Sequence, residues 1–294
     1  MAPEPTRGTF TVDGESFAYL AWGDPSGEPV LCLHGFPDVP HTWGPVAERL
    51  AAEGYRVVAP WMRGYAPSTL RGPFTVEQLA NDALAFADFV SPGAPLRIVG
   101  HDWGAVVTYA ATAAARSRFL QAATIAVPHP NAFFAMLGRD LGQWKRSAYM
   151  GFFQLPRLPE RTLRQGNFAF LDKMWRAWSP GVELPTGYLD EVKASLRASL
   201  PAPLEYYRSL VRPARAAFDR FRRAAAPTAY VAVPTLYLHG DRDRVMPPPP
   251  GDLHRRWFTG PCEQRVVPNA GHFAELDNPA YVAAELLRWF RTVA

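Results

Sequence analysis

Short apolar runs bounded by glycine, proline or polar residues recur over the first 130 residues and again after residue 234. Runs of this length, rich in Val, Ile and Leu, predict buried β-strands. Asp13-Gly14 separates two of the runs and predicts an antiparallel hairpin near the start of the chain. The predicted strands are Phe10–Val12, Phe17–Trp22, Val30–His34, Arg56–Pro60, Leu96–Gly100, Ala123–Val127, Thr235–Gly240 and Glu263–Val267.

Stretches with helical spacing of their apolar residues fill the intervals between these runs. Thr75 and Gln78 have the spacing of a capping box at the start of one such stretch. The predicted helices are Trp43–Glu53, Thr75–Val90, Ala105–Arg116 and Pro279–Val293. Strands that alternate with helices predict βαβ units, and therefore an α/β fold with a mostly parallel eight-stranded sheet.

The alternation stops after Pro128, where a long helical, aromatic and arginine-rich segment begins. The α/β pattern resumes only at Thr235. We therefore expect one core domain, residues 1–130 and 214–294, split by a helical insertion at residues 131–213. Open parallel sheets bind ligands at the carboxyl ends of their strands. An insertion above those ends would form a cap, or lid, over the site.

The composition is that of a globular protein, because 48% of the 294 residues are hydrophobic. The formal net charge is +4. Residues 132–226 hold 16 Lys and Arg against 8 Asp and Glu. Since no nucleic-acid-binding motif accompanies this basic stretch, we interpret it as a solvated surface of the insertion. We expect no nucleic-acid partner.

Other classes of protein are excluded by what the sequence lacks. No run approaches the ~20 apolar residues of a membrane span, and the N-terminal segment has no apolar core of a signal peptide. We therefore expect a cytoplasmic protein with no membrane partner. Cys32 and Cys262 are too few for a disulfide framework and stand in no metal-binding cluster. Without a phosphate-binding loop either, the sequence predicts no cofactor and no metal.

Reactive chemistry is indicated by Gly100–Gly104, which reads Gly-His-Asp-Trp-Gly between a predicted strand and a predicted helix. Small residues two positions before and after Asp102 allow a sharp turn that exposes this side chain at the top of the sheet, as in a nucleophile elbow. The alternative is an aspartate that merely caps the following helix. The strand context and the partners described next favour the nucleophile.

Two further segments complete a catalytic constellation. His34–Pro37 (His-Gly-Phe-Pro) follows a strand where such a fold forms its oxyanion hole, and the expected donors are the backbone amides of Phe36 and Trp103. His272 follows the last strand. The chain order nucleophile, acid, histidine then requires an acid in the loop after Thr235–Gly240. Asp241 and Asp243 both qualify, and we favour Asp243.

These motifs, together with Arg63-Gly64-Tyr65, resemble those of the epoxide hydrolases with the α/β-hydrolase fold, close relatives of the haloalkane dehalogenases. The resemblance extends over nearly the whole chain. It implies two cap tyrosines that face the nucleophile, and the matching segments point to Tyr149 and Tyr207. It also implies substrate contacts, for which the candidates are Trp103, Phe36, Pro37, Phe153 and Phe273. The sequence departs from the pattern at Trp61, where relatives often have Asp, and at Ala66, where they often have Gly.

The resemblance implies an enzyme that opens a small-molecule epoxide to a vicinal diol. Asp102 would form an ester with the substrate, and water activated by His272 and Asp243 would hydrolyse that ester. A haloalkane dehalogenase with the same triad is the alternative, and a non-catalytic ligand-binding homologue is a further one. Fluoroacetate-type chemistry is disfavoured because that subgroup has Arg in place of Trp103. The protein is expected to be a monomer or a homodimer.

Overall fold

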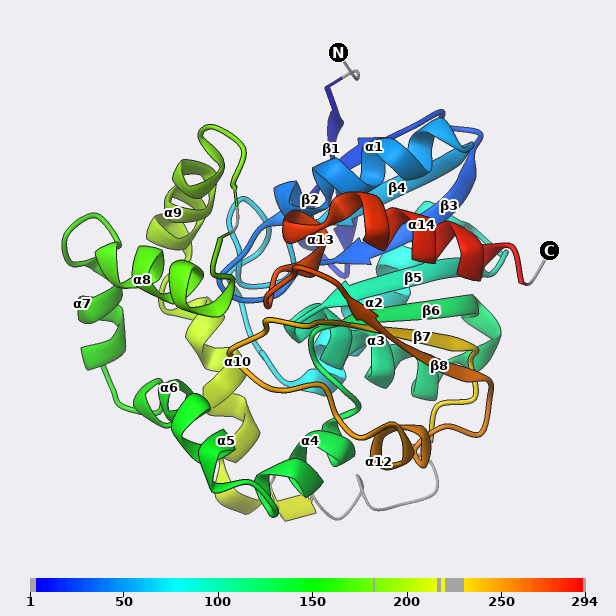
Figure 1. The fold of residues 1–294 in the computed structure, drawn as a ribbon. Helices are drawn as coiled ribbons and strands as arrows, with labels where there is room; N and C mark the ends of the chain where they lie inside the picture. The colour runs from blue at the N-terminus through cyan, green and yellow to red at the C-terminus, as the bar shows by residue number, and fades with distance from the viewer. Residues whose placement is uncertain (1–3, 182, 216–217, 220–229, 293–294) are drawn as a thin grey trace.

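The computed structural model describes residues 4–181, 183–215, 218–219 and 230–292. Eight strands form one sheet in the order β1-β2-β4-β3-β5-β6-β7-β8 (Figure 1). The β1–β2 and β2–β4 pairs are antiparallel, and all other neighbours are parallel. This confirms the predicted α/β-hydrolase fold. The strands are β1 (Thr6–Val12), β2 (Glu15–Trp22), β3 (Glu28–Leu33), β4 (Tyr55–Pro60), β5 (Leu96–His101), β6 (Phe119–Ile125), β7 (Thr235–Gly240) and β8 (Cys262–Val267).

Helices pack on both faces of the sheet. α1 (Gly44–Ala52) contacts α14 (Pro279–Phe290), and α2 (Val76–Val90) contacts α3 (Trp103–Ala114), as Figure 1 shows. The Thr75 side chain accepts a hydrogen bond from the Gln78 amide at 3.3 Å, as the capping-box spacing predicts. Short helical turns complete the core: η1 (Pro40–Trp43), η2 (Arg116–Arg118), α12 (Gly251–Arg255) and α13 (Ala274–Asp277). The expected end of the last helix at Val293 lies outside the described residues.

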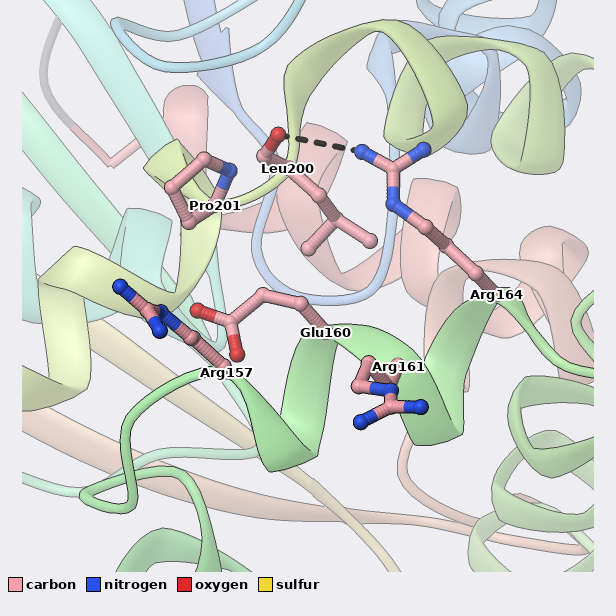
Figure 2. Close-up of a pocket in the computed structure, with 6 residues that line it drawn as sticks. All are labelled: Arg157, Glu160, Arg161, Arg164, Leu200 and Pro201. Carbon is pink, nitrogen blue, oxygen red and sulfur yellow. Dashed lines mark hydrogen bonds between the residues drawn. The ribbon is translucent and has the colours of Figure 1, made fainter.

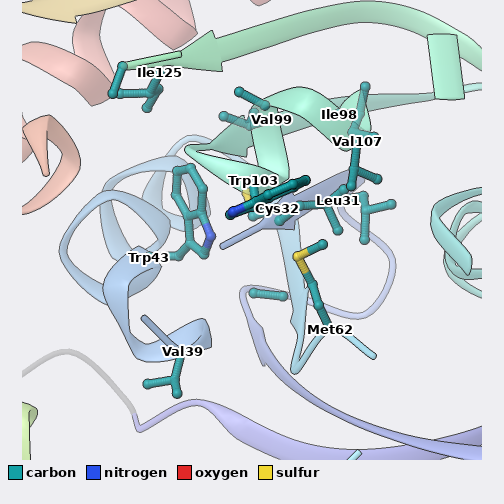
Figure 3. Close-up of a cluster of buried hydrophobic side chains, with 14 of the residues drawn as sticks. Leu31, Cys32, Val39, Trp43, Met62, Ile98, Val99, Trp103, Val107 and Ile125 are labelled. Carbon is teal, nitrogen blue, oxygen red and sulfur yellow. The ribbon is translucent and has the colours of Figure 1, made fainter. Parts of the chain in front are cut away.

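The centre of the sheet is buried on both faces, which is why its strands are continuous apolar runs without polar alternation. All six residues of β5 are buried. Figure 3 shows Leu31 and Cys32 of β3, Ile98 and Val99 of β5 and the indole of Trp103 in one apolar cluster. This packing holds the carboxyl ends of β3 and β5 in place, and both ends lead into candidate site residues.

β6 differs from the sequence prediction, because it begins at Phe119 and not at Ala123. The fully buried polar side chain of Gln121 interrupts the apolar pattern there. Its amide group donates to the Trp289 carbonyl at 2.6 Å, and its oxygen accepts from Arg97 Nε at 3.2 Å. These partners come from distant parts of the chain, so the hydrophobic pattern could not show them. The strand ends at Ile125 because Ala126 adopts a φ of 68°.

The segment between β6 and β7 is mostly helical over its described residues, with one isolated bridge between Val231 and Phe258. In Figure 1 most of its helices gather beside one end of the sheet. Among the residues that the structure describes, no helix is both long and apolar enough to cross a bilayer. The helices of this segment are α4 (Pro130–Leu137), α5 (Leu141–Arg146), α6 (Ala148–Phe152), α7 (Leu158–Arg164), α8 (Ala169–Trp178), α9 (Tyr188–Ser199) and α10 (Ala202–Val211).

Candidate active site

Asp102 forms a sharp turn between β5 and α3. Its φ of 51° and ψ of −115° lie outside the regions that a residue with a side chain normally adopts, and strain of this kind is common at functional sites. The turn also needs a small residue at position 100, since a Cβ on Gly100 would lie 2.2 Å from the Gly104 carbonyl oxygen. The Asp102 carboxylate does not cap α3. Its Oδ1 accepts a hydrogen bond from the Phe36 amide instead, at 2.8 Å.

The loop after β3 supplies this amide. A Cβ on Gly35 would lie 2.3 Å from the Cβ of Asp102, so glycine is required for the loop to pass this close to the aspartate. Trp103 is the first residue of α3, and its amide is one of those at the helix N-terminus that lack an intrahelical acceptor. Both candidate oxyanion donors therefore flank Asp102.

His272 lies between two carboxylates. Its Nδ1 is 3.0 Å from Asp243 Oδ2, and its Nε2 is 3.6 Å from Asp102 Oδ2. The histidine is fully buried, and Asp102 is 6% exposed. Asp102, Asp243 and His272 are distant in the sequence. The turn after β5 and the loops after β7 and β8 bring them next to one another.

Of the two candidate acids, Asp243 is the one within hydrogen-bonding distance of His272. The amides of Val245 and Met246 donate to its Oδ1, at 2.6 and 3.2 Å, and leave Oδ2 for the histidine. Asp241 Oδ1 accepts instead from the Ala270 amide at 3.0 Å and stabilises the neighbouring loop.

Electrostatic interactions outweigh burial in setting the pKa of His272 and the pKa of Asp243. Burial opposes the charged form of His272, but the charges and hydrogen bonds of Asp243 and Asp102 outweigh it and raise the pKa of His272 to about 10. Burial likewise opposes ionisation of Asp243, yet its interactions with His272 lower the pKa of this carboxyl below its ordinary value. The imidazole of His272 is therefore protonated at neutral pH in the resting site.

Tyr149 on α6 and Tyr207 on α10 face the same site from the helical segment. Their ring centroids are 5.9 Å apart, and the Tyr207 ring lies 5.1 Å from Trp103 and 5.6 Å from Phe36. Burial first, and the negative charge of Asp102 in addition, raise the pKa of both tyrosines above its ordinary value. Both hydroxyls therefore stay protonated at neutral pH and can donate.

The remaining candidate contacts lie around these groups. The fully buried Phe153 ring lies 5.4 Å from Phe36 and 5.2 Å from Tyr207. Pro37 follows Phe36 through a cis peptide bond. Phe273 stacks on Trp175 at 3.4 Å and lies 5.3 Å from the His272 ring. Among the positions where the sequence departs from its relatives, Trp61 is buried and has an edge contact with His41 at 5.4 Å.

A buried polar cluster behind His272 was missed by the sequence analysis. His101 Nε2 lies 3.0 Å from the His272 carbonyl oxygen, which can only accept, so Nε2 is protonated. Burial lowers the pKa of His101 to about 3, and the ring is therefore neutral. Its Nδ1 then has a lone pair that faces Glu275 Oε1 at 3.0 Å. Burial raises the pKa of Glu275 well above its ordinary value.

Asp38 completes this cluster. Its Oδ1 accepts hydrogen bonds from the Val39 amide and from the hydroxyl of Tyr188, on α9. Potential ligand atoms of Asp38, His101 and Glu275 lie within 4.8 Å of one another. A metal ion there would have to replace protons, because burial raises the pKa of both carboxyls, that of Asp38 to about 7. Asp38 and Glu275 are single acidic residues far apart in the chain, so no spacing could have revealed the cluster in the sequence.

A separate hollow of about 400 Å³ lies on the helical segment, at α7 and the turn between α9 and α10 (Figure 2). Two of its charged residues have partners in the protein: Glu160 pairs with Arg208 at 2.8 Å, and Arg164 donates to the Leu200 carbonyl at 3.2 Å. None of the candidate catalytic residues lines it. The lining residues are Arg157, Glu160, Arg161, Arg164, Leu200 and Pro201.

Comparison with known proteins agrees with this geometry. Residues 30–285 match the alpha/beta hydrolase family. Epoxide hydrolase 3 of Xenopus tropicalis is 30% identical over 286 residues, which cover 92% of this chain and 73% of that protein. Epoxide hydrolase A of Mycobacterium tuberculosis is 26% identical, with 97% of each chain covered.

A solved structure extends the comparison to the fold. The Bacillus megaterium epoxide hydrolase in complex with an inhibitor superimposes with a TM-score of 0.83 at 21% identity. The superposition covers 97% of this chain and 100% of that one. The chain therefore belongs to the alpha/beta hydrolase family, as a relative of its epoxide hydrolases.

Proposed function

We propose that this protein is an epoxide hydrolase that forms a covalent ester on Asp102 and releases a vicinal diol. One observation carries the proposal: two protonated tyrosine hydroxyls share a buried site with a carboxylate that lies 3.6 Å from a histidine. The names of the relatives support the same activity.

In the first step, an oxygen of Asp102 attacks a ring carbon of the epoxide and the carbon–oxygen bond of the ring breaks. A carboxylate is itself a nucleophile, so this attack needs no base. Oδ1 is held by the Phe36 amide, so Oδ2 is the nucleophile and Oδ1 becomes the ester carbonyl oxygen. The electron pair of the broken bond stays on the epoxide oxygen as an alkoxide.

The alkoxide takes a proton from Tyr149 or Tyr207 while the other hydroxyl hydrogen-bonds to it. An alkoxide is about as basic as hydroxide, whose conjugate acid has a pKa of ~15.7, so a tyrosine with an ordinary pKa of ~10 is the stronger acid. Burial raises the pKa of both tyrosines and so narrows the difference in pKa between tyrosine and alkoxide. Esterification of Asp102 removes a negative charge that also raises the pKa of both tyrosines, and proton transfer becomes easier as the bond forms.

In the second step, His272 takes a proton from water, and the resulting hydroxide attacks the carbonyl carbon of the ester. Esterification prepares His272 for this role as well, since the lost charge of Asp102 is one cause of its raised pKa. The amides of Phe36 and Trp103 stabilise the oxyanion, and loss of one such donor typically costs ~10²–10³ in rate. The diol oxygen leaves with the proton from His272. The proton that His272 loses on esterification restores the tyrosine, and the proton of the new Asp102 carboxyl returns to His272, so that Asp102 is a carboxylate again.

We further propose that residues 131–213 form a cap domain on a core of residues 1–130 and 214–294. The insertion holds both tyrosines, whereas the core holds the nucleophile, the acid and the histidine. The cap would therefore supply the acid for ring opening and separate the reacting atoms from bulk solvent.

Parallel assays with aryl and alkyl epoxides and with haloalkanes test the proposal, with diol and halide release as the readouts. We expect diol from epoxides with the wild-type protein and none with Asp102→Ala, whose folding is checked by circular dichroism. Halide release without diol formation would favour the dehalogenase alternative, since a halide leaving group takes no proton from a tyrosine. Full activity of Asp102→Ala would exclude Asp102 as the nucleophile.

A further inference from the structure

Three consecutive backbone amides of the loop that holds His272 have separate acceptors. The Gly271 amide donates to Asp277 Oδ2 at 2.5 Å, the His272 amide to the Trp178 carbonyl at 3.1 Å, and the Phe273 amide to Ser179 Oγ at 3.0 Å. Trp178 and Ser179 lie at the C-terminal end of α8, in the insertion. Two of these three hydrogen bonds therefore cross from the insertion to the core.

Ser179 is the centre of this contact. Its hydroxyl accepts from Phe273 and donates to Asp277 Oδ2 at 2.8 Å, so one side chain bridges both ends of the histidine loop. Ser179 is 1% exposed. The fit leaves no spare room, because a Cβ on Gly271 would lie 2.5 Å from the Cα of Ser179 and 2.6 Å from the Trp178 carbonyl oxygen.

The same contact reaches the side chains that react. The Trp178 ring lies 5.4 Å from the His272 ring and 5.1 Å from the Tyr149 ring, and so packs against both the base and the acid. On the other side, His101 Nε2 holds the His272 carbonyl at 3.0 Å. The His272 backbone is thus fixed by the core through its carbonyl and by α8 through its amide.

We propose that Ser179 is a positioning residue that couples the placement of His272 to the docking of α8, and that ester hydrolysis depends on it far more than ring opening does. The inference rests on the proposed function. Ring opening uses the Asp102 carboxylate and the tyrosines, with no base. Hydrolysis needs Nε2 of His272 aligned with a water molecule, and misplacement of a reacting group by ~1 Å can cost ~100-fold in rate.

Ser179→Ala tests this inference in the full-length protein, because it deletes the hydroxyl and leaves the rest of the fold. Stopped-flow tryptophan fluorescence with a single epoxide substrate separates the two steps, since Trp103 lies beside the nucleophile. We expect ring opening within about twofold of the wild-type rate and ester hydrolysis slower by about 10-fold to 100-fold. The covalent intermediate should therefore accumulate during turnover.

Ser199→Ala is the matched control. Ser199 is also a buried serine of the insertion, 2% exposed, and it also bridges to the core, where it accepts from the Ala66 amide at 2.8 Å. The structure records no contact between Ser199 and the loop that holds His272. A loss of general packing would slow both variants alike, whereas a positioning role of Ser179 slows hydrolysis only in Ser179→Ala.

Equal slowing of both steps in Ser179→Ala, or no change in hydrolysis, would overturn the inference. Should this variant not fold, Asp277→Asn gives the same test, because it weakens the acceptor shared by Gly271 and Ser179. A wild-type protein that forms no ester with any epoxide would contradict the proposed function itself, and that result is seen in the wild-type trace before any variants are compared.

Discussion

In the proposed mechanism, the charge on Asp102 decides whether His272 can act as a base. While Asp102 is ionised, it helps to raise the pKa of His272 to about 10, and the imidazole is then protonated at neutral pH. The same residue pair therefore has two states. Before ring opening the imidazolium stabilises the nucleophile, and after esterification a neutral imidazole can accept a proton from water.

Asp102→Asn should mimic the ester, because it removes the charge and keeps the shape. We expect the pKa of His272 to fall, by ~1–3 units for the loss of an adjacent charge. Titration of the His272 ring by NMR measures this directly. His101 is the internal reference, since burial keeps that ring neutral in both proteins. An unchanged pKa of His272 would show that Asp243 alone sets it.

Sequence reasoning singled out Asp102 and His272 because each stands in a short glycine-containing motif after a strand. It favoured Asp243 over Asp241, and in the structure Asp243 is the one within hydrogen-bonding distance of His272. Ser179 and Glu275 could not be predicted at all. Their roles depend on hydrogen bonds to residues far away in the chain, Phe273 for Ser179 and Thr42 for Glu275.

At the scale of elements, two helices of the insertion present one tyrosine each to the nucleophile. α6 and α10 are distant in sequence, yet the rings of Tyr149 and Tyr207 both contact Phe153, at 5.6 and 5.2 Å. The helices hold these rings by packing, so removal of the hydroxyls alone should leave the elements intact.

Tyr149→Phe and Tyr207→Phe should each slow ring opening, within the ~10²–10⁴ span of a positioned general acid. A single change can cost less, because the partner hydroxyl can substitute. The double variant should lose nearly all ring opening, since residues that act as a unit are non-additive. Pre-steady-state fluorescence measures the step, and Tyr206→Phe is the control because its hydroxyl donates to the Arg63 carbonyl. Wild-type ring opening by the double variant would refute the tyrosine assignment.

Strands and helices were predicted correctly where the local hydrophobic pattern agrees with the tertiary contacts. All eight strands were predicted. The central parallel strands are buried apolar runs, and β1 and β2 flank the Asp13-Gly14 turn. The predicted β6 begins four residues late, at Ala123 and not at Phe119. The reason is Gln121, a buried polar residue with distant partners. α3 begins at Trp103 and not at Ala105, since the strained turn at Asp102 brings the chain into the helix at once.

At the scale of the whole molecule, buried carboxyls link the insertion to the core. The Tyr188 hydroxyl of α9 donates to Asp38, which lies near Glu275 in the core. Burial raises the pKa of Asp38 to about 7 from an ordinary value of 3.8, despite its hydrogen bonds with Tyr188, the Val39 amide and Thr42. The folded protein therefore binds this proton more tightly than the unfolded chain does.

The sign of the pH dependence follows from this shift. A raised pKa in the folded state contributes stability that is fully present below about pH 4 and is lost as the pH rises through about 7. At 1.36 kcal/mol per unit, the whole contribution is on the order of 4 kcal/mol. Asp38→Asn keeps an acceptor for Tyr188 and removes the titration.

We therefore expect the free energy of unfolding of Asp38→Asn, relative to wild type, to increase between pH 5 and pH 8.5. Denaturant unfolding at both pH values measures the difference. Asp88→Asn, at a carboxylate whose side chain is 68% exposed, should show no comparable increase. If the free energies of unfolding of the wild type and Asp38→Asn change in parallel with pH, ionisation of Asp38 does not destabilise the folded protein.

The covalent Asp102 ester is tested most directly by intact-protein mass spectrometry of His272→Gln. This variant retains the nucleophile and the tyrosines but lacks the base for hydrolysis, so the ester should persist. With an epoxide that the wild-type protein hydrolyses, we predict a mass increase of one substrate molecule, located in the peptide that contains Asp102 and missing when Asp102→Asn is added. If His272→Gln binds the epoxide and gains no mass, catalysis does not proceed through an ester on Asp102.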